Sequence, residues 1–215
     1  MEKQKLPIFQ SLQYGLQTTL NNTRLIILGY LAMLAAILGI IIVCAIEIWL
    51  FREYGISIFL GIFIPTFLFG MLFISSLSIG FEKLLLQIHD QGDSKVKVIF
   101  SCFSITPAYF IAQLLYLLLI LLGLICFIIP GLILAARLSL FPLFIIDYDA
   151  GIISSLKQSY HVTKGYTFEL IILKGISKII EFLGGMIIIG SFITIPLTML
   201  SDIYIYRFLL TKNQQ

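Results

Sequence analysis

Long apolar runs dominate the chain and alternate with short polar segments. A helix of about 20 apolar residues is long enough to cross the hydrocarbon core of a bilayer, which is about 30 Å thick. Several runs reach that length, and the one beginning at Leu25 extends to Phe51. We therefore predict about six transmembrane helices, at residues 25–51, 56–80, 107–128, 131–146, 168–195 and 196–210.

Two further segments have the periodicity of amphipathic helices. In residues 7–22, apolar side chains recur every three or four positions and glutamines occupy the opposite side. In residues 150–164, an apolar stripe faces away from Lys157, His161 and Lys164. Helices of this kind lie in the plane of the membrane interface. The fold class predicted for residues 1–215 is thus a single all-α, polytopic membrane domain with two interfacial helices.

Proline and glycine punctuate the apolar runs. Pro130–Gly131 and Pro196 each predict a tight turn between two spans, because proline lacks the amide that a continuing helix needs. The resulting order is an amphipathic segment, a span, a turn and a span, three times over. The sequences SLQYGL at Ser11 and SLKQSY at Ser155 support a repeat, although such short matches also arise by chance in an apolar chain.

Composition excludes an ordinary soluble protein. Hydrophobic residues make up 60% of the 215 residues and charged residues 12%, against roughly half and a quarter in average proteins. The mean hydropathy is +1.06. The net charge of +3 is too small to indicate nucleic-acid binding. The three cysteines are far apart and form no CxxC motif, so we expect small buried side chains and neither a disulfide framework nor a metal site.

The distribution of cations predicts the orientation. With both termini in the cytoplasm, Arg52 is the cation that falls clearly outside, and Arg137 lies within a span. The cytoplasmic side then holds Lys3, Lys5, Arg24, Lys83, Lys95, Lys97, Lys157, Lys164, Lys174, Lys178, Arg207 and Lys212. By the positive-inside rule, the N-terminus and the C-terminus are both expected to be cytoplasmic.

Arg137 and Asp202 are charged residues within predicted spans, each a few residues after a predicted turn. A charge in hydrocarbon costs at least a few kcal/mol and usually pairs or lines a wet cavity. We therefore expect the two side chains to face each other. One interpretation is a structural ion pair, and the other is a polar pathway or substrate site.

No recognisable catalytic or cofactor-binding motif is present. The sequence lacks GxSxG, HExxH, GxGxxG and P-loop patterns, and Ser154-x-x-Lys157 has no partner motif. We expect neither enzymatic activity nor a cofactor. Lys157, His161 and Lys164 on the second amphipathic helix are candidates for contact with anionic lipid headgroups.

The segment IIPGLILAARLSLFPLFIIDYDAGIISSLKQSYHVTKGY resembles the YciC-like bacterial inner-membrane proteins. It also resembles the membrane domain attached to some glycerophosphodiester phosphodiesterases. The residues that carry the resemblance are Pro130, Gly131, Arg137, Asp147, Asp149, Ser155, Leu156, Ser159, Lys164 and Gly165. Ser155 stands where that pattern usually has alanine. The resemblance covers about 40 residues and implies a six-span helical protein of a bacterial inner membrane, with no activity attached.

These observations favour a non-catalytic accessory or scaffold protein of the inner membrane. The alternative is a small transporter or lipid-handling protein with a polar site at Arg137 and Asp202. The expected partners are the lipid bilayer, anionic lipid headgroups, and other proteins or a second copy of the chain.

Overall fold

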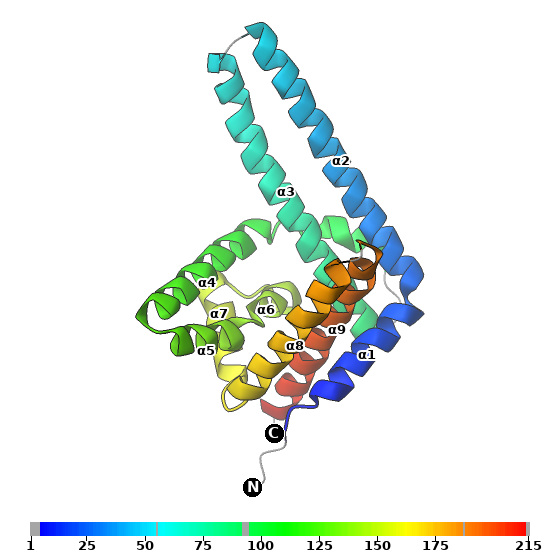
Figure 1. Ribbon diagram of the computed structural model, residues 1–215, viewed down its shortest axis with the longest axis vertical. Coiled ribbons are helices and arrows are strands. Elements are labelled where there is room, and N and C mark those ends of the chain that lie inside the picture. Colours follow the sequence, from blue (N-terminus) through cyan, green and yellow to red (C-terminus); the bar gives the residue numbers. More distant parts are fainter. Residues whose placement is uncertain (1–4, 55, 92–94, 187, 214–215) are drawn as a thin grey trace.

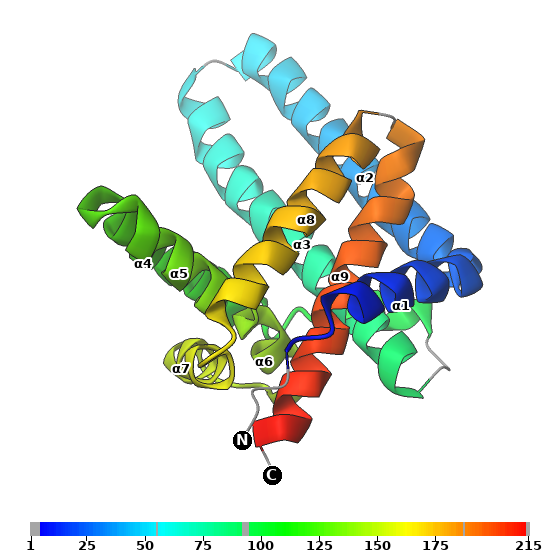
Figure 2. The same cartoon turned by 60° about the horizontal axis from the view of Figure 1, so that its bottom comes forward.

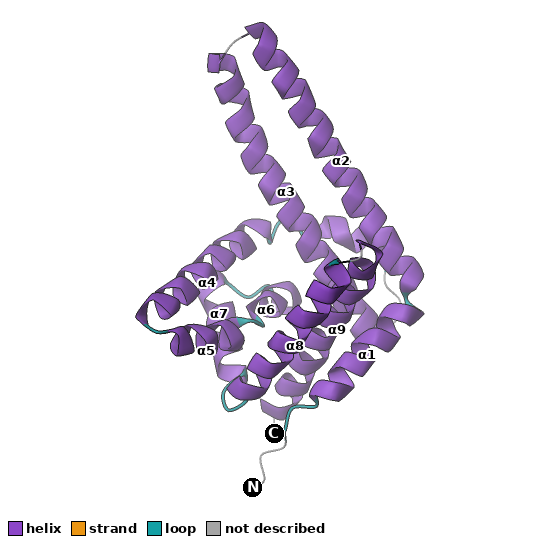
Figure 3. Ribbon diagram, in the orientation of Figure 1, coloured by secondary structure: helices purple, strands orange, loops and turns teal. Residues whose placement is uncertain are grey.

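The computed structural model describes residues 5–54, 56–91, 95–186 and 188–213, with side chains left out at 50–60, 91, 126, 188 and 189. Within these residues every regular element is a helix, and there is no strand (Figure 3). The α-helices are α1 (Ile8–Asn21), α2 (Thr23–Tyr54), α3 (Ile56–Gln91), α4 (Thr106–Cys126), α5 (Ile128–Leu138), α6 (Phe141–Tyr148), α7 (Ile152–Val162), α8 (Thr167–Gly185) and α9 (Ile188–Asn213). A 3₁₀ helix, η1 (Val96–Ser101), precedes α4.

Three helical hairpins extend from a common base (Figures 1 and 2). They are formed by α2 with α3, by α4 with α5, and by α8 with α9. A short element precedes each hairpin, namely α1, η1 and α7. This order confirms the all-α, polytopic fold class. It also agrees with the predicted alternation of amphipathic segments and hairpins.

Five segments of the described chain are long and apolar enough to cross a membrane. They are Thr23–Trp49, Gly61–Asp90, Thr106–Ile125, Ile128–Tyr148 and Gly190–Asn213. The predicted span 168–195 begins in α8, which has four charged residues among its 19 and is not among these five. Because α1 begins and α9 ends at the same end of the molecule (Figure 1), α8 and α9 together run out and back like the other two hairpins.

The turn of the third hairpin was predicted wrongly. Helix α8 ends at Gly185 and α9 begins at Ile188, and Pro196 is inside α9 instead of at a turn. The predicted spans 168–195 and 196–210 therefore meet about ten residues earlier than expected. A Cβ atom at Gly184 would overlap the Thr194 side chain, so the glycine lets the two helices approach closely just below the turn. Proline is tolerated within membrane helices, where neighbouring groups satisfy the freed carbonyl.

The turn of the second hairpin also differs from the prediction. The extended residue is Phe127, with φ −162° and ψ 146°, and α5 already begins at Ile128. Pro130 lies in the first turn of α5, where its missing amide has no partner to lose. A Cβ at Gly123 of α4 would lie 2.9 Å from the Gly131 Cα. The Pro130–Gly131 pair thus marks a helix start and a close helix contact.

The fourth predicted span, 131–146, is not one continuous helix. Helix α5 ends at Leu138, and α6 begins at Phe141 with Pro142 in its first turn. The proline cannot donate a hydrogen bond to the preceding turn, which favours a break there. Five of the eight residues of α6 are buried in the base.

The short elements connect the hairpins to one another. Element η1 packs on α3, the second helix of the first hairpin, and α7 packs on α5 and α6, which complete the second. Helix α1 packs along α9, the last helix of the third hairpin. Each short element therefore contacts the second helix of the hairpin that precedes it, and α1 closes the ring.

Helices α1 and α7 make these contacts with the same pattern of small residues. Buried positions four residues apart hold Ser11, Gly15 and Thr19 in α1 and Ser155, Ser159 and Thr163 at α7. The serine that begins each series donates to a carbonyl three residues earlier, at 2.8 Å and 2.9 Å. The threonine that ends each series donates to a carbonyl four residues earlier, at 2.7 Å in both helices. The two helices thus share the spacing of their buried small residues and the hydrogen bonds at both ends of the series.

The C-terminal half of α3 continues past the predicted span 56–80 and lies in the core of the base. Phe81, Leu84 and Leu85 are at most 2% exposed. They pack with buried side chains of η1, α6, α8 and α9. The outer parts of the hairpins expose large apolar side chains instead, as expected for surfaces that face lipid.

We predict that Gly15→Ala destabilises the protein by about 1–3 kcal/mol, because the new methyl group overlaps the Leu197 carbonyl oxygen of α9. Thermal unfolding in detergent micelles measures the change. Gly39→Ala in α2 is the control, since nothing lies within 4 Å of its added Cβ. Equal unfolding temperatures for the two variants would contradict close packing of α1 on α9.

Candidate functional site: a charged cluster between α3, α8 and α9

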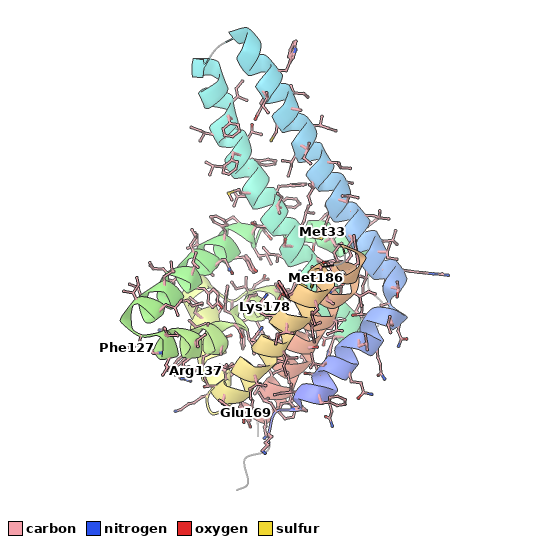
Figure 4. The ribbon with its side chains drawn as sticks, in the orientation of Figure 1. Met33, Phe127, Arg137, Glu169, Lys178 and Met186 are labelled. Atoms are coloured by element: carbon pink, nitrogen blue, oxygen red, sulfur yellow. The ribbon has the colours of Figure 1, made fainter. Side chains whose placement is uncertain are left out.

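Ionisable side chains join α8 to α9. The Lys174 ammonium donates to Asp202 Oδ2 at 2.7 Å, and Lys178 donates to Glu181 Oε2 at 2.6 Å. Thr198 of α9 donates to the other Glu181 oxygen at 2.8 Å. Lys178 and Glu181 are three residues apart, a spacing at which side chains on one helix can pair. Figure 4 shows Glu169 near the base of α8 and Lys178 farther along the same helix.

A third helix contributes a carboxylate to this region. Glu82 of α3 is partly buried and interacts electrostatically with both Asp202 and Lys174. Tyr109 of α4 interacts electrostatically with Glu82 in turn. We call Glu82, Lys174 and Asp202 the charged cluster. Glu82 lies just beyond the predicted span 56–80, and the apolar residues around it (Phe81 and Leu84–Leu86) are the signal in the sequence that this turn is packed.

The predicted pair of Arg137 and Asp202 does not form. Asp202 pairs with Lys174, and the Arg137 guanidinium lies 3.4 Å from the centre of the Tyr160 ring. Arg137 also donates to the Tyr160 carbonyl oxygen at 2.8 Å. The reason is the break after Leu138, which places Arg137 in the last turn of α5, beside α7 (Figure 4). A basic side chain at a helix C-terminus is also favoured by the helix dipole.

Ser159 explains part of the motif on which the family resemblance depends. Its hydroxyl donates to the Arg137 carbonyl at 2.8 Å and accepts from the Leu140 amide at 3.2 Å. These are backbone groups that the break between α5 and α6 leaves without helical partners. Thr163 donates to the same Arg137 carbonyl at 3.1 Å. The motif therefore stabilises an interrupted helix.

The remaining motif residues have structural positions as well. Ser155 is fully buried in the contact face of α7. Gly165 has φ 91°, a conformation that side-chain-bearing residues rarely adopt, and it follows the end of α7. Lys164 beside it is exposed.

Arg207 of α9 holds two other helices at the base. It donates to Asp147 of α6 at 2.7 and 3.1 Å, and its Nε donates to Asp90 of α3 at 3.0 Å. The Tyr206 hydroxyl donates to Asp147 as well, at 3.0 Å. Asp147 accepts these bonds and does not cap the following helix, since the residue before α7 is Gly151, which makes no side-chain cap.

A groove of about 930 Å³ opens between α6, α7 and α9. Its lining is mainly apolar and includes Phe144, Tyr148 and Leu210. The polar lining residues all come from α7 and are Ser154, Lys157, Gln158 and His161. The groove therefore combines an apolar floor with a basic edge.

The described residues offer no metal site, since no three His, Cys, Asp or Glu side chains lie close enough to hold an ion. Cys102 is fully buried beside η1, and desolvation by burial raises the pKa of its thiol. Cys44 is partly buried, and the side chain of Cys126 lies outside the described residues.

Comparison with known proteins identifies no relative: no family model, no curated protein and no solved structure matches the chain.

We predict that Ser159→Ala destabilises the protein by about 1–3 kcal/mol, because the buried Leu140 amide and Arg137 carbonyl lose their partner. The free energy of unfolding in mixed micelles is the measurement. Ser154→Ala, on the exposed side of the same helix, should change it by less than about 0.5 kcal/mol. Equal losses for both variants would show that the hydroxyl does not stabilise the break.

A double-mutant cycle distinguishes the two possible partners of Asp202. We expect Lys174→Met and Asp202→Asn to couple by about 1 kcal/mol, because they remove one ion pair. Arg137→Met and Asp202→Asn should be additive within about 0.5 kcal/mol. The reverse pattern would restore the pair predicted from the sequence.

Proposed function

We propose that this protein is a non-catalytic, lipid-handling accessory protein of a bacterial inner membrane, with both termini in the cytoplasm. The orientation is supported by the cations near the base, which holds the end of α9 and the start of α1 (Figure 1). The inner-membrane location is supported by the resemblance of residues 127–165 to the YciC-like proteins. The absence of a recognisable catalytic motif in the sequence supports the non-catalytic role.

The observation that favours lipid handling is the groove between α6, α7 and α9. Its volume of about 930 Å³ lies within the range of small-molecule sites, and its floor is apolar. Lys157 and His161 lie on its edge and are exposed. An acyl chain matches the floor, and an anionic headgroup matches the basic edge, since each Lys or Arg near an anionic surface contributes about 1 kcal/mol.

Helix α7 is oriented suitably for such a ligand. Its exposed surface mixes Ile153 and Tyr160 with Lys157 and His161, as in helices that lie at the membrane interface. The groove would then open at the depth of the headgroups. A scaffold role needs only the apolar outer faces of the hairpins, whereas lipid handling also accounts for the basic groove.

The alternative function, a transporter with a polar site, would have to use residues other than the predicted pair. The polar site at Arg137 and Asp202 is replaced by the charged cluster, in which Glu82 and Lys174 accompany Asp202. Most of these side chains have partners, as a structural role would also require. The groove therefore supports the function better than the cluster does.

The test is retention of phosphatidylglycerol by the full-length protein in detergent, measured by native mass spectrometry over a lipid titration. We expect the variant Lys157→Gln to bind phosphatidylglycerol about fivefold more weakly, and Lys157→Gln with His161→Gln to bind it more weakly still. Phosphatidylcholine binding should be weaker than phosphatidylglycerol binding and unaffected by either change.

Lys97→Gln is the matched control, because Lys97 is equally exposed but lies in η1, outside the groove. Phosphatidylglycerol affinity should stay within twofold of that of the unmodified protein. If Lys97→Gln and Lys157→Gln weaken binding equally, the attraction is a general effect of surface charge and the groove is not the site.

A further inference from the structure

In the charged cluster, Glu82 is the carboxylate that has no cation of its own to balance its charge. The cluster contains one ammonium group, Lys174, and two carboxylates, Glu82 and Asp202. The ammonium donates its short hydrogen bond to Asp202, at 2.7 Å. The next cation along α8, Lys178, is paired with Glu181. Among the described residues, no hydrogen-bond or ion-pair partner is found for the Glu82 side chain.

The surroundings of Glu82 disfavour a second negative charge. Glu82 and Asp202 lie within the candidate spans Gly61–Asp90 and Gly190–Asn213. The residues beside Glu82 include Phe81, Leu84 and Leu85, all buried. Two carboxylates that share a desolvated site repel each other, and uptake of one proton removes the repulsion. The facing ionisable groups from other elements are Asp202, Lys174 and Tyr109.

Unused polar atoms lie in the same region. The Oδ1 atom of Asp202 is buried and makes no hydrogen bond, although Oδ2 is bound to Lys174. The hydroxyl of Ser177, a residue only 3% exposed, is also without a partner. Ser177 lies three residues after Lys174 and four before Glu181, and so on the same face of α8. A proton or an ordered water has acceptors here that the protein itself does not satisfy.

We propose that Glu82 is a proton-binding site at the junction of α3, α8 and α9. In the protonated state the cluster is neutral, with the Lys174–Asp202 pair beside an uncharged carboxylic acid. In the deprotonated state it has a net negative charge. The side chains of Lys174 and Asp202 are 26% and 24% exposed, so other parts of the protein do not enclose the cluster completely. The proton is exchanged with water at a Glu82 carboxylate oxygen.

The test uses dicyclohexylcarbodiimide on the full-length protein in lipid nanodiscs. The carbodiimide reacts with a protonated carboxyl in apolar surroundings: the acid adds across one C=N bond and the adduct rearranges to a stable N-acylurea. Peptide mass mapping locates it. We expect modification of Glu82 at pH 6, and a rate that falls about tenfold per pH unit once the group is mainly ionised.

Two variants should move this profile in opposite directions. Asp202→Asn removes the repelling charge and frees Lys174 for Glu82, so modification at pH 7 should fall at least about tenfold. Lys174→Gln removes the cation, and modification should persist to higher pH. Glu82→Gln should abolish it. Glu169→Gln, in the first turn of α8, is the control and should leave the profile unchanged.

The proposal is overturned if Glu82 is unmodified throughout the pH range, or if Asp202 is modified in its place. It is also overturned if Asp202→Asn and Lys174→Gln leave the profile where it was. Thermal unfolding of each variant shows which are folded. If Asp202→Asn does not fold, the upward shift with Lys174→Gln decides the question.

Discussion

The structure depends on the contact between each short element and the second helix of the preceding hairpin. The hairpins expose apolar outer faces to lipid, which gives them no hydrophobic reason to associate with one another. Close packing of small residues and hydrogen bonds must hold them together instead. On α1 this contact uses Gly15 against α9, and the Ser201 hydroxyl donates to the Ser11 carbonyl at 3.0 Å. On α7 it uses Ser159 at the break between α5 and α6.

Charged residues complete the association where the helices converge. Arg207 joins α3, α6 and α9 at the base, and Lys174 joins α8 to α9. A buried ion pair is weak support for stability in itself, but leaving one partner unpaired is costly, so such pairs fix which helices meet. Glu82 differs from the carboxylates of these pairs, because no hydrogen bond or ion pair to a cation is found for it among the described residues.

The helices and most of the spans could be predicted from the sequence, because hydropathy and helical periodicity are set by residues that are close together along the chain. The turns were less predictable. A proline such as Pro130 or Pro196 is compatible with a turn, with the first turn of a helix or with the interior of a membrane helix. Which of these positions it occupies here depends on the close contacts that nearby glycines make with another helix. The partner of Asp202 could not be predicted, because Lys174 lies opposite it only when α8 ends at Gly185 and α9 begins at Ile188. The same holds for Glu82, whose surroundings come from three helices.

Several of the residues that carry the resemblance to the YciC-like proteins have structural roles in this fold. The motif within residues 127–165 forms the break between α5 and α6, the contact face of α7 and its glycine stop. A chain that shares this motif therefore shares a way of folding the second hairpin, and no chemistry follows from it. Glu82, Lys174 and Asp202 lie outside that segment, and Lys157 and His161 are exposed positions within it that the fold leaves free. Whatever distinguishes this protein from others of similar architecture is therefore expected at those five side chains.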